Sequence, residues 1–208
     1  YANKGREYQK CGHPEPVKVY DFIDKTLGKV APYGIYDLGR NEGFVNVGIS
    51  HDTAEFAVNS IRSWWHEMGG DAYPAATELF ITADCGGSNS YRGRLWKIEL
   101  QKLADELALS IRVSHFPPGT SKWNKIEHKM FCYISKNWRG RPLISRETVV
   151  NLIGNTTTAT GLRIRAKLDE QVYEKGRKVT DEELDAVNLE RAAFHGEWNY
   201  TIHPTCRA

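Results

Sequence analysis

Short apolar runs alternate with amphipathic stretches through the middle of the chain, and this order restricts the fold more than any other sequence feature. Leu79–Ala83 and Ile111–Phe116 have the length and composition of buried strands. The segment between them has helical periodicity, with one stripe formed by Trp96, Leu100, Leu103 and Leu107. Upstream, Gly34–Leu38 and Phe44–Ile49 flank the turn GRNEG and predict an antiparallel hairpin. We therefore expect an α/β fold with a mixed sheet and helices on both faces.

Local signals predict where several other elements begin and end. Asp52, with Glu55 three residues later, predicts a helix N-cap, and Gly69-Gly70 predicts the end of that helix. The apolar face of this helix is expected to contain Ala57, Val58, Ile61, Trp64, Trp65 and Met68. Thr180 and Glu183 predict a capping box for a last short helix.

The remaining periodic segments complete the predicted order of elements. Val17–Ile23 and Gly161–Leu168 are expected to be strands, and Ser145–Asn155 a helix. A further helix is expected to direct Trp123, Ile126, Met130, Ile134 and Trp138 inward. We interpret residues 1–140 as the core of the domain and residues 141–208 as a C-terminal extension of the same domain.

Composition is that of an ordinary globular protein. Of the 208 residues, 40% are hydrophobic and 26% charged, and no apolar run is long enough to cross a bilayer. The net charge of +2 permits nucleic acid binding but does not argue for it. Four scattered cysteines without CxxC spacing indicate reduced thiols, and we expect a cytoplasmic location.

Two acidic residues follow the two predicted buried strands. Asp84 comes directly after Leu79–Ala83, and Glu127 follows the second strand after the stretch HFPPGTSKWNKIEH, in which Pro117 and Pro118 stop the strand. If the two strands are parallel neighbours, both carboxylates lie at the carboxyl edge of the sheet, where α/β proteins place their sites. Converging carboxylates are typical ligands of Mg²⁺ or Mn²⁺. A structural interpretation is also open, because Asp84 can form an Asx turn and Glu127 can be a solvated first-turn glutamate.

Several motifs resemble those of a known transposase family. The segments PYGIYDLGRNEGFVNVG, HDTAEFAVNSIRSWW, ITADCGGSN, HFPPGTSKWNKIEH, NWRGRPL and HGEWNYTI are similar to the DDE domain of ISAzo-type, or Rhodopirellula-type, bacterial transposases, which are distantly related to the Tc/mariner group. The resemblance covers nearly the whole chain and implies an RNase H-like fold. It also implies two-metal cleavage and strand transfer of DNA, with Asp84 and Glu127 as the second and third acidic residues.

The first acidic residue is not identified by this resemblance within the chain. From the residues alone, Asp21 and Asp37 are candidates. In the family pattern, however, the stretch resembling NKGREYQKCG already follows the first catalytic strand. The resemblance therefore predicts that this chain begins after that strand, lacks one metal ligand and is inactive alone.

The same resemblance predicts the partners. Arg92, Arg94, Lys122 and Lys125 flank the two carboxylates and are expected to contact DNA phosphates, although each can equally belong to a solvated helix face. His115 and His128 are candidates to orient water or a carboxylate. We expect transposon-end and target DNA as substrates, a homo-oligomeric synaptic complex and association with the nucleoid. The alternatives are another RNase H-like nuclease, or an inactive transposase remnant that only binds DNA.

Overall fold

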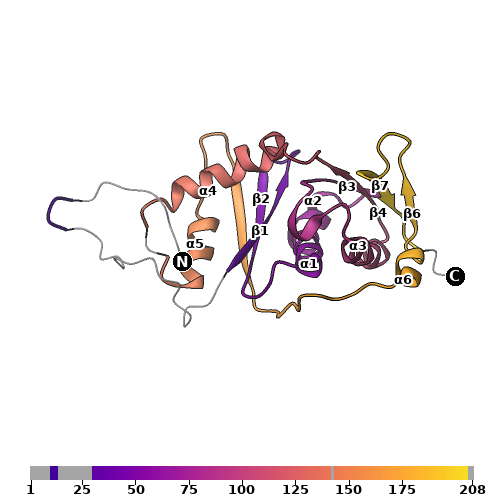
Figure 1. Ribbon diagram of the computed structural model, residues 1–208. Helices are drawn as coiled ribbons and strands as arrows, with labels where there is room; N and C mark the ends of the chain where they lie inside the picture. Colours follow the sequence, from indigo (N-terminus) through magenta and orange to yellow (C-terminus); the bar gives the residue numbers. More distant parts are fainter. Residues whose placement is uncertain (1–9, 14–29, 142, 206–208) are drawn as a thin grey trace. The chain divides into compact units, whose positions relative to one another are not determined.

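The described strands form two mixed sheets. The computed structural model describes residues 10–13, 30–141 and 143–205, and its chain divides into two compact units, residues 1–50 with 126–171 and residues 51–125 with 172–208. Each unit contains one sheet, with strand orders β1-β2-β5 and β3-β4-β7-β6 (Figure 1). The expected mixed α/β fold class is confirmed. Sequence patterns predict strands and their direction but not which strands share a sheet, which explains why one sheet was expected. The predicted strand Val17–Ile23, with Asp21, lies outside the described residues.

The first unit is built on the predicted hairpin. Strands β1 (Ala31–Asp37) and β2 (Glu42–Gly48) pair antiparallel, and β2 pairs parallel with β5 (Arg163–Asp169). Val45 and Val47 alternate with Phe44 and Asn46 along β2, so the two sets face opposite sides of the sheet.

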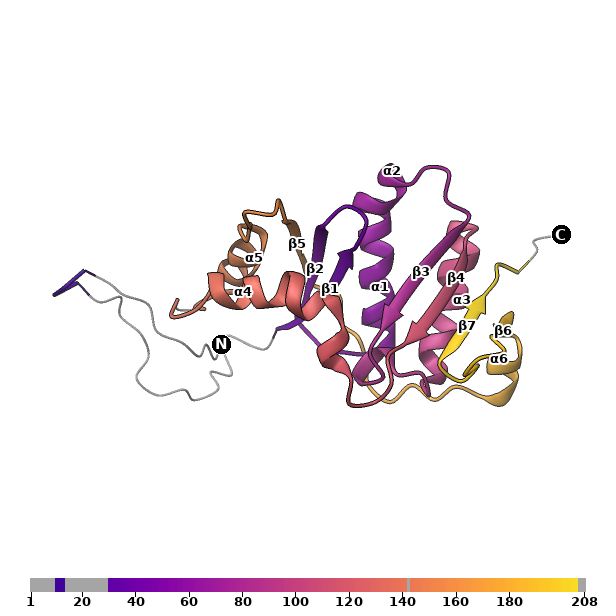
Figure 2. The same ribbon diagram turned by 90° about the horizontal axis from the view of Figure 1, so that it is seen from above.

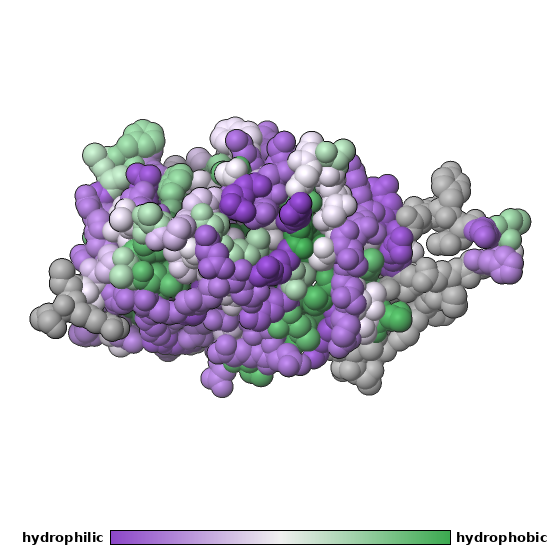
Figure 3. All heavy atoms as spheres, turned by 180° about the vertical axis from the view of Figure 1, so that it is seen from behind, coloured by the Kyte–Doolittle hydropathy of each residue, from purple (hydrophilic) through white to green (hydrophobic). Residues whose placement is uncertain are grey.

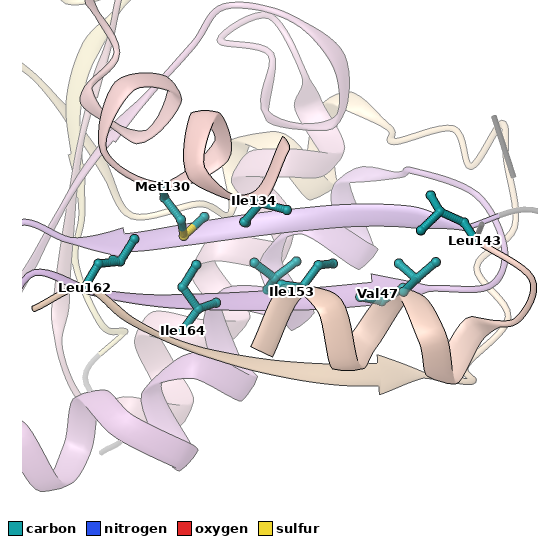
Figure 4. Close-up of a cluster of buried hydrophobic side chains, with 9 residues drawn as sticks. Val47, Met130, Ile134, Leu143, Ile153, Leu162 and Ile164 are labelled. Atoms are coloured by element: carbon teal, nitrogen blue, oxygen red, sulfur yellow. The ribbon is translucent and has the colours of Figure 1, made fainter. Parts of the chain in front are cut away.

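Helices pack against the face of this sheet that carries Val45 and Val47. They are η4 (Glu127–Phe131, a π-helical turn), α4 (Cys132–Asn137) and α5 (Arg146–Gly154), which begins with the N-cap Ser145. Figure 4 shows their side chains meeting those of β2 and β5 in one buried cluster, which consists of Val45, Val47, Met130, Ile134, Leu143, Val149, Ile153, Leu162 and Ile164. Burial of this apolar surface is the main stabilising contribution in this unit.

The second unit contains the predicted parallel β/α unit. Strand β3 (Glu78–Ala83) is followed by helix α3 (Arg94–Leu107) and by strand β4 (Ser110–His115), which pairs parallel with β3. Strands β7 (Asn199–Ile202) and β6 (Leu189–Arg191) extend the sheet antiparallel beyond β4 (Figure 2). The predicted apolar stripe of α3 is confirmed, because Trp96, Leu100 and Leu103 are fully buried.

Helix α1 (Ala54–Trp64) lies beside α3 but differs from its predicted limits at both ends. Its N-cap is Thr53, not Asp52, because the Thr53 hydroxyl accepts the hydrogen bond from the Phe56 backbone nitrogen. The helix does not end at Gly69-Gly70. It continues through the π-helical turn η1 (Trp65–Gly69) into α2 (Gly70–Ala72), because Gly69 and Gly70 both keep right-handed helical dihedral angles.

The segment before α6 (Asp181–Asp185) lies against the helices of the second unit. Arg177 forms ion pairs with Glu55 of α1, Glu99 of α3 and Glu183, and so fastens residues 172–180 to both helices. The predicted capping box of Thr180 and Glu183 is confirmed at the start of α6.

One predicted core residue is wrong. Trp123 lies in the short 3₁₀ turn η3 (Ser121–Trp123) and is 60% exposed, because the helical turns that carry Met130 and Ile134 begin only at Lys125. Met130 and Ile134 are buried as predicted. Among the described residues, no helix has the length and apolar character needed to span a membrane.

Candidate active site

Asp84 lies where the parallel pair of strands ends. Ala83, the last residue of β3, is in register with His115, the last residue of β4, so both strands end at the same edge of the sheet. Asp84 follows β3 directly, and the proline turn that leads toward Glu127 leaves β4 at the same edge. The strand-end argument from the sequence is therefore confirmed for Asp84 and for the start of this turn.

The Asp84 carboxylate is held by the loop that follows it. Its Oδ1 atom accepts a hydrogen bond from Asn89 Nδ2 at 2.9 Å and a longer one from the Gly86 backbone nitrogen at 3.4 Å. The longer contact has the sequence separation of an Asx turn, so the structural interpretation of this residue is partly correct. Among the described residues, Oδ2 of Asp84 accepts no hydrogen bond and remains available to a ligand. Gly87 has a φ of +62°, which permits the tight loop.

A buried chain of hydrogen bonds supports the backbone of Asp84. His115 Nδ1 lies 3.0 Å from the Asp84 carbonyl oxygen, and His115 Nε2 lies 3.0 Å from the Tyr200 hydroxyl. Because a carbonyl oxygen only accepts, Nδ1 carries the hydrogen, and the neutral ring accepts at Nε2 from the Tyr200 O–H. Trp96 Nε1 in turn donates to the Tyr200 oxygen at 2.9 Å.

The pKa shifts of His115 and Tyr200 agree with these donor and acceptor roles. Burial lowers the pKa of His115 and keeps the ring neutral, and burial also raises the pKa of the Tyr200 hydroxyl. His115 therefore positions the Asp84 loop through its backbone. It is not arranged to orient water, as the sequence had suggested as one possibility.

The proline turn is tied to the Asp84 loop. The Phe116 backbone nitrogen donates to the Ala83 carbonyl at 2.8 Å, and the Cys85 thiol donates to the Phe116 carbonyl at 2.7 Å. Burial and the neighbouring Asp84 carboxylate raise the pKa of Cys85, so the thiol keeps the proton that it donates. The two loops at this edge of the sheet are thus held together by direct hydrogen bonds.

Glu127 belongs to the first unit, where it is the first residue of η4 and is exposed. Its turn is positioned by residues that follow it, since Met130 and Phe131 lie over Gly34 of β1. A Cβ atom on Gly34 would lie only 2.5 Å from Phe131 Cζ, and Gly43 of β2 is similarly crowded by Met130. Two glycines in the hairpin therefore permit the close approach of the turn that carries Glu127.

The sequence of the whole chain was compared with known protein families. Residues 1–204 match the Rhodopirellula transposase DDE domain. This chain belongs to that family. Searches among curated proteins and among solved structures each found no match. The family membership confirms the resemblance seen in the sequence and supports a transposase function, with DNA as the class of substrate.

The basic residues of this DDE domain lie in different environments. Arg92 is exposed, its guanidinium carbon lies 5.1 Å from the centre of the Tyr91 ring, and its Nε atom donates to the Tyr91 hydroxyl at 2.7 Å. Arg94 pairs with Asp181 at 2.5 Å, so a DNA phosphate would have to compete with this carboxylate. Lys122 and Lys125 are exposed beside Trp123, on the segment that leads to Glu127.

The candidate first carboxylate, Asp37, has a structural role in the described fold. Its Oδ1 atom accepts hydrogen bonds from the backbone nitrogens of Gly39 and Arg40, at 2.9 and 3.1 Å, and thereby closes the β1–β2 turn. This arrangement explains an aspartate at that position without a metal.

The donor chemistry of Asp84 and Glu127 fits a divalent metal ion. Both are carboxylates, the hard oxygen ligands that Mg²⁺ and Mn²⁺ prefer. Asp84 has one carboxylate oxygen without a partner among the described residues, and the carboxylate of Glu127 has no hydrogen bond or ion pair among them. In the described part of the chain, no group of three or more His, Cys, Asp or Glu side chains is arranged to bind a metal.

The sequence did not predict the buried residues whose hydrogen bonds support the Asp84 backbone. Tyr200 is far from Asp84 along the chain, and no local signal predicts the hydrogen bonds that join Tyr200 to His115 and to Trp96. Lys97, which follows Arg92 and Arg94 closely in the sequence, is buried and donates to the Tyr91 carbonyl at 2.9 Å.

Proposed function

We propose that this chain is the catalytic domain of a bacterial insertion-sequence transposase that cleaves DNA at a transposon end and transfers the freed 3′-hydroxyl to target DNA. The observation that carries the proposal is the position of Asp84. It follows a strand in register with β4, in a chain that matches a DDE domain over residues 1–204.

Asp84 and Glu127 are the proposed metal ligands, together with a third carboxylate that the described residues do not supply. Divalent ions bound there would activate the attacking oxygen and stabilise the leaving oxygen of a phosphodiester. Asn89 fixes the orientation of Asp84, while His115, through the Asp84 carbonyl, fixes the backbone that carries it. Arg92, Lys122 and Lys125 are proposed to contact phosphates, and Arg94 would do so by exchanging Asp181 for the phosphate.

The experiment measures nicking by the protein expressed in its natural reading frame. The substrate is DNA that carries the flanks of that reading frame, with Mg²⁺, Mn²⁺ or EDTA. We expect nicking only with Mg²⁺ or Mn²⁺, and a loss of at least about a hundredfold in Asp84→Asn and in Glu127→Gln.

The matched controls remove equivalent carboxylates outside the proposed site. Asp71→Asn in α2 and Glu170→Gln after β5 change exposed acids in the same two units and are expected to retain activity. Full activity of both Asp84→Asn and Glu127→Gln would overturn the assignment of these ligands.

A further inference from the structure

The turn between β6 and β7 lies at the same edge of its sheet as Asp84. Asn199, the first residue of β7, is in register with Ser114 near the end of β4, and the Trp198 carbonyl accepts a hydrogen bond from the His115 backbone nitrogen at 2.9 Å. The turn of residues 192–198 therefore protrudes at the carboxyl end of β3 and β4. In a sheet whose strands are about 4.8 Å apart, β7 lies roughly 10 Å from β3.

Aromatic rings form a continuous row from the tip of this turn to the loop after Asp84. Phe194 contacts the edge of His195, with ring centroids 4.4 Å apart, and His195 stacks on Trp198 at 5.1 Å. Trp198 meets Tyr91 edge to face, with ring centroids 6.2 Å apart. Arg92 lies over the Tyr91 ring. We call these five side chains the aromatic row.

The outer end of the row is exposed although it is apolar. Phe194 is 76% exposed, and Figure 3 shows apolar residues gathered at the tip of this hairpin, at the upper left. The turn is nevertheless well fixed. The His195 carbonyl accepts hydrogen bonds from the backbone nitrogens of Trp198 and Asn199, and Asn199 Nδ2 donates to the Phe194 carbonyl. An exposed ring on a fixed turn loses little conformational freedom when a ligand binds.

An unpaired DNA base is the ligand whose chemistry fits this row. Aromatic rings and guanidinium planes stack on the faces of unpaired bases, whatever their sequence. Arg92 at one end of the row and Arg191, which donates to the Gly196 carbonyl of the same turn, are exposed cations and favour a polyanion. The acidic Glu197 is hydrogen-bonded to His195. Bases become unpaired where a strand is opened for cutting, next to the proposed catalytic carboxylate.

We propose that the aromatic row binds an unpaired base beside the scissile phosphate, with Phe194 as the stacking ring. The proposal rests on the proposed function and names a subsite of it. Stacking is independent of the metal, so it can be measured separately from cleavage.

The test compares two single-stranded probes by fluorescence anisotropy, in EDTA and at fixed low salt, with the full 208-residue chain. One probe is oligothymidylate of about twelve nucleotides, and the other is an abasic oligomer of the same length and charge. The unmodified chain is expected to bind the thymidylate probe more tightly. Phe194→Ala is expected to weaken that binding about 5- to 100-fold and to leave abasic binding unchanged.

Two further variants separate stacking from general effects. Phe194→Tyr keeps an aromatic ring and is expected to retain the affinity for the thymidylate probe. Phe80→Ala removes a 53% exposed ring from β3 of the same unit and is expected to leave the binding of both probes unchanged. Equal binding of the two probes by the unmodified chain, or equal losses for both probes in Phe194→Ala, would overturn the proposal.

Nicking and stacking can fail separately. If the thymidylate preference depends on Phe194 while nicking is absent, the row binds single strands and the proposed function falls. If metal-dependent nicking requires Asp84 but Phe194→Ala binds both probes like the unmodified chain, the row has no such role.

Discussion

The side chains around Asp84 contact it at two different places, the carboxylate and the backbone. Asn89 orients the carboxylate, whereas His115 holds the backbone from below and is itself held by Tyr200. The polar atoms that link His115 to Trp96 through Tyr200 all form hydrogen bonds. This buried hydrogen-bond network stabilises one arrangement of the loop that carries Asp84. A metal ligand gains from such support, since its oxygen is already in place when the ion binds.

Lys97 provides a test of the buried surroundings of this loop. Burial lowers the pKa of Lys97 below its ordinary value of 10.5, and Arg191 and Arg94 lower it further. Between the lowered pKa of the folded state and 10.5, the unfolded chain binds more protons than the folded one, so the free energy of unfolding rises with pH through that window. Lys97→Met removes this contribution.

We therefore expect urea unfolding from pH 7.5 upward to show a steeper rise in stability for the unmodified chain than for Lys97→Met. Lys102→Met, which removes an exposed lysine from the same helix, is the control and is expected to keep the slope of the unmodified chain. Equal slopes for the unmodified chain and Lys97→Met would show that Lys97 is not desolvated in the folded protein.

Single residues also show how far the sequence predicts the site. Asp84 was predicted as a site residue from its place after an apolar strand, and the register of β3 and β4 confirms that place but does not test the role. The buried partners Tyr200 and Trp96 could not be found, since their hydrogen bonds join residues about a hundred positions apart and leave no periodicity. Lys97 has the same limitation, because a lysine in a helix is normally solvated.

At the scale of elements, the hairpin and the π-helical turn η4 are fitted to each other. Gly34→Ala would place a methyl group 2.5 Å from Phe131 Cζ and 2.6 Å from Met130 Cε. The turn would have to move, and we expect a loss of about 1–3 kcal/mol in the free energy of unfolding. Urea unfolding of the variant measures this loss.

Gly154→Ala is the matched control in the same unit. Its added methyl group meets Ala166 Cβ at 3.8 Å, which is ordinary contact, and alanine is favoured over glycine in helix α5. We expect this control to be neutral or slightly stabilising. Equal losses in the two variants would contradict a specific close approach of η4 to the hairpin.

Elements defined by local patterns were predicted well, and those that depend on tertiary contacts were not. The hairpin, α3 and the capping box of α6 follow from turn residues, apolar spacing and side-chain capping. The N-cap at Thr53 was missed because Asp52 and Thr53 are both good caps and the choice depends on the backbone. Trp123 was misplaced because helical spacing was extended across a 3₁₀ turn.

At the scale of the whole molecule, the two proposed carboxylates belong to different units. Asp84 lies in the second unit and Glu127 in the first, and residues 116–125 are the segment that leads from one to the other. The division at residue 140, the third carboxylate and the oligomeric state stay predictions. If the proposed ligands are correct, each unit contributes one of them, so we expect neither unit to be active when expressed without the other.

Strand transfer distinguishes the proposed transposase activity from simple DNA cleavage. A labelled DNA that ends in the transposon flank is incubated with Mg²⁺, a supercoiled target plasmid and the protein expressed in its natural reading frame. The labelled DNA carries either a 3′-hydroxyl or a 3′-deoxy end. We expect joining of the label to the plasmid only with the 3′-hydroxyl end, and no joining by Asp84→Asn or Glu127→Gln. Metal-dependent nicking without any joining would indicate a nuclease, and joining that survives in both variants would contradict the proposed site.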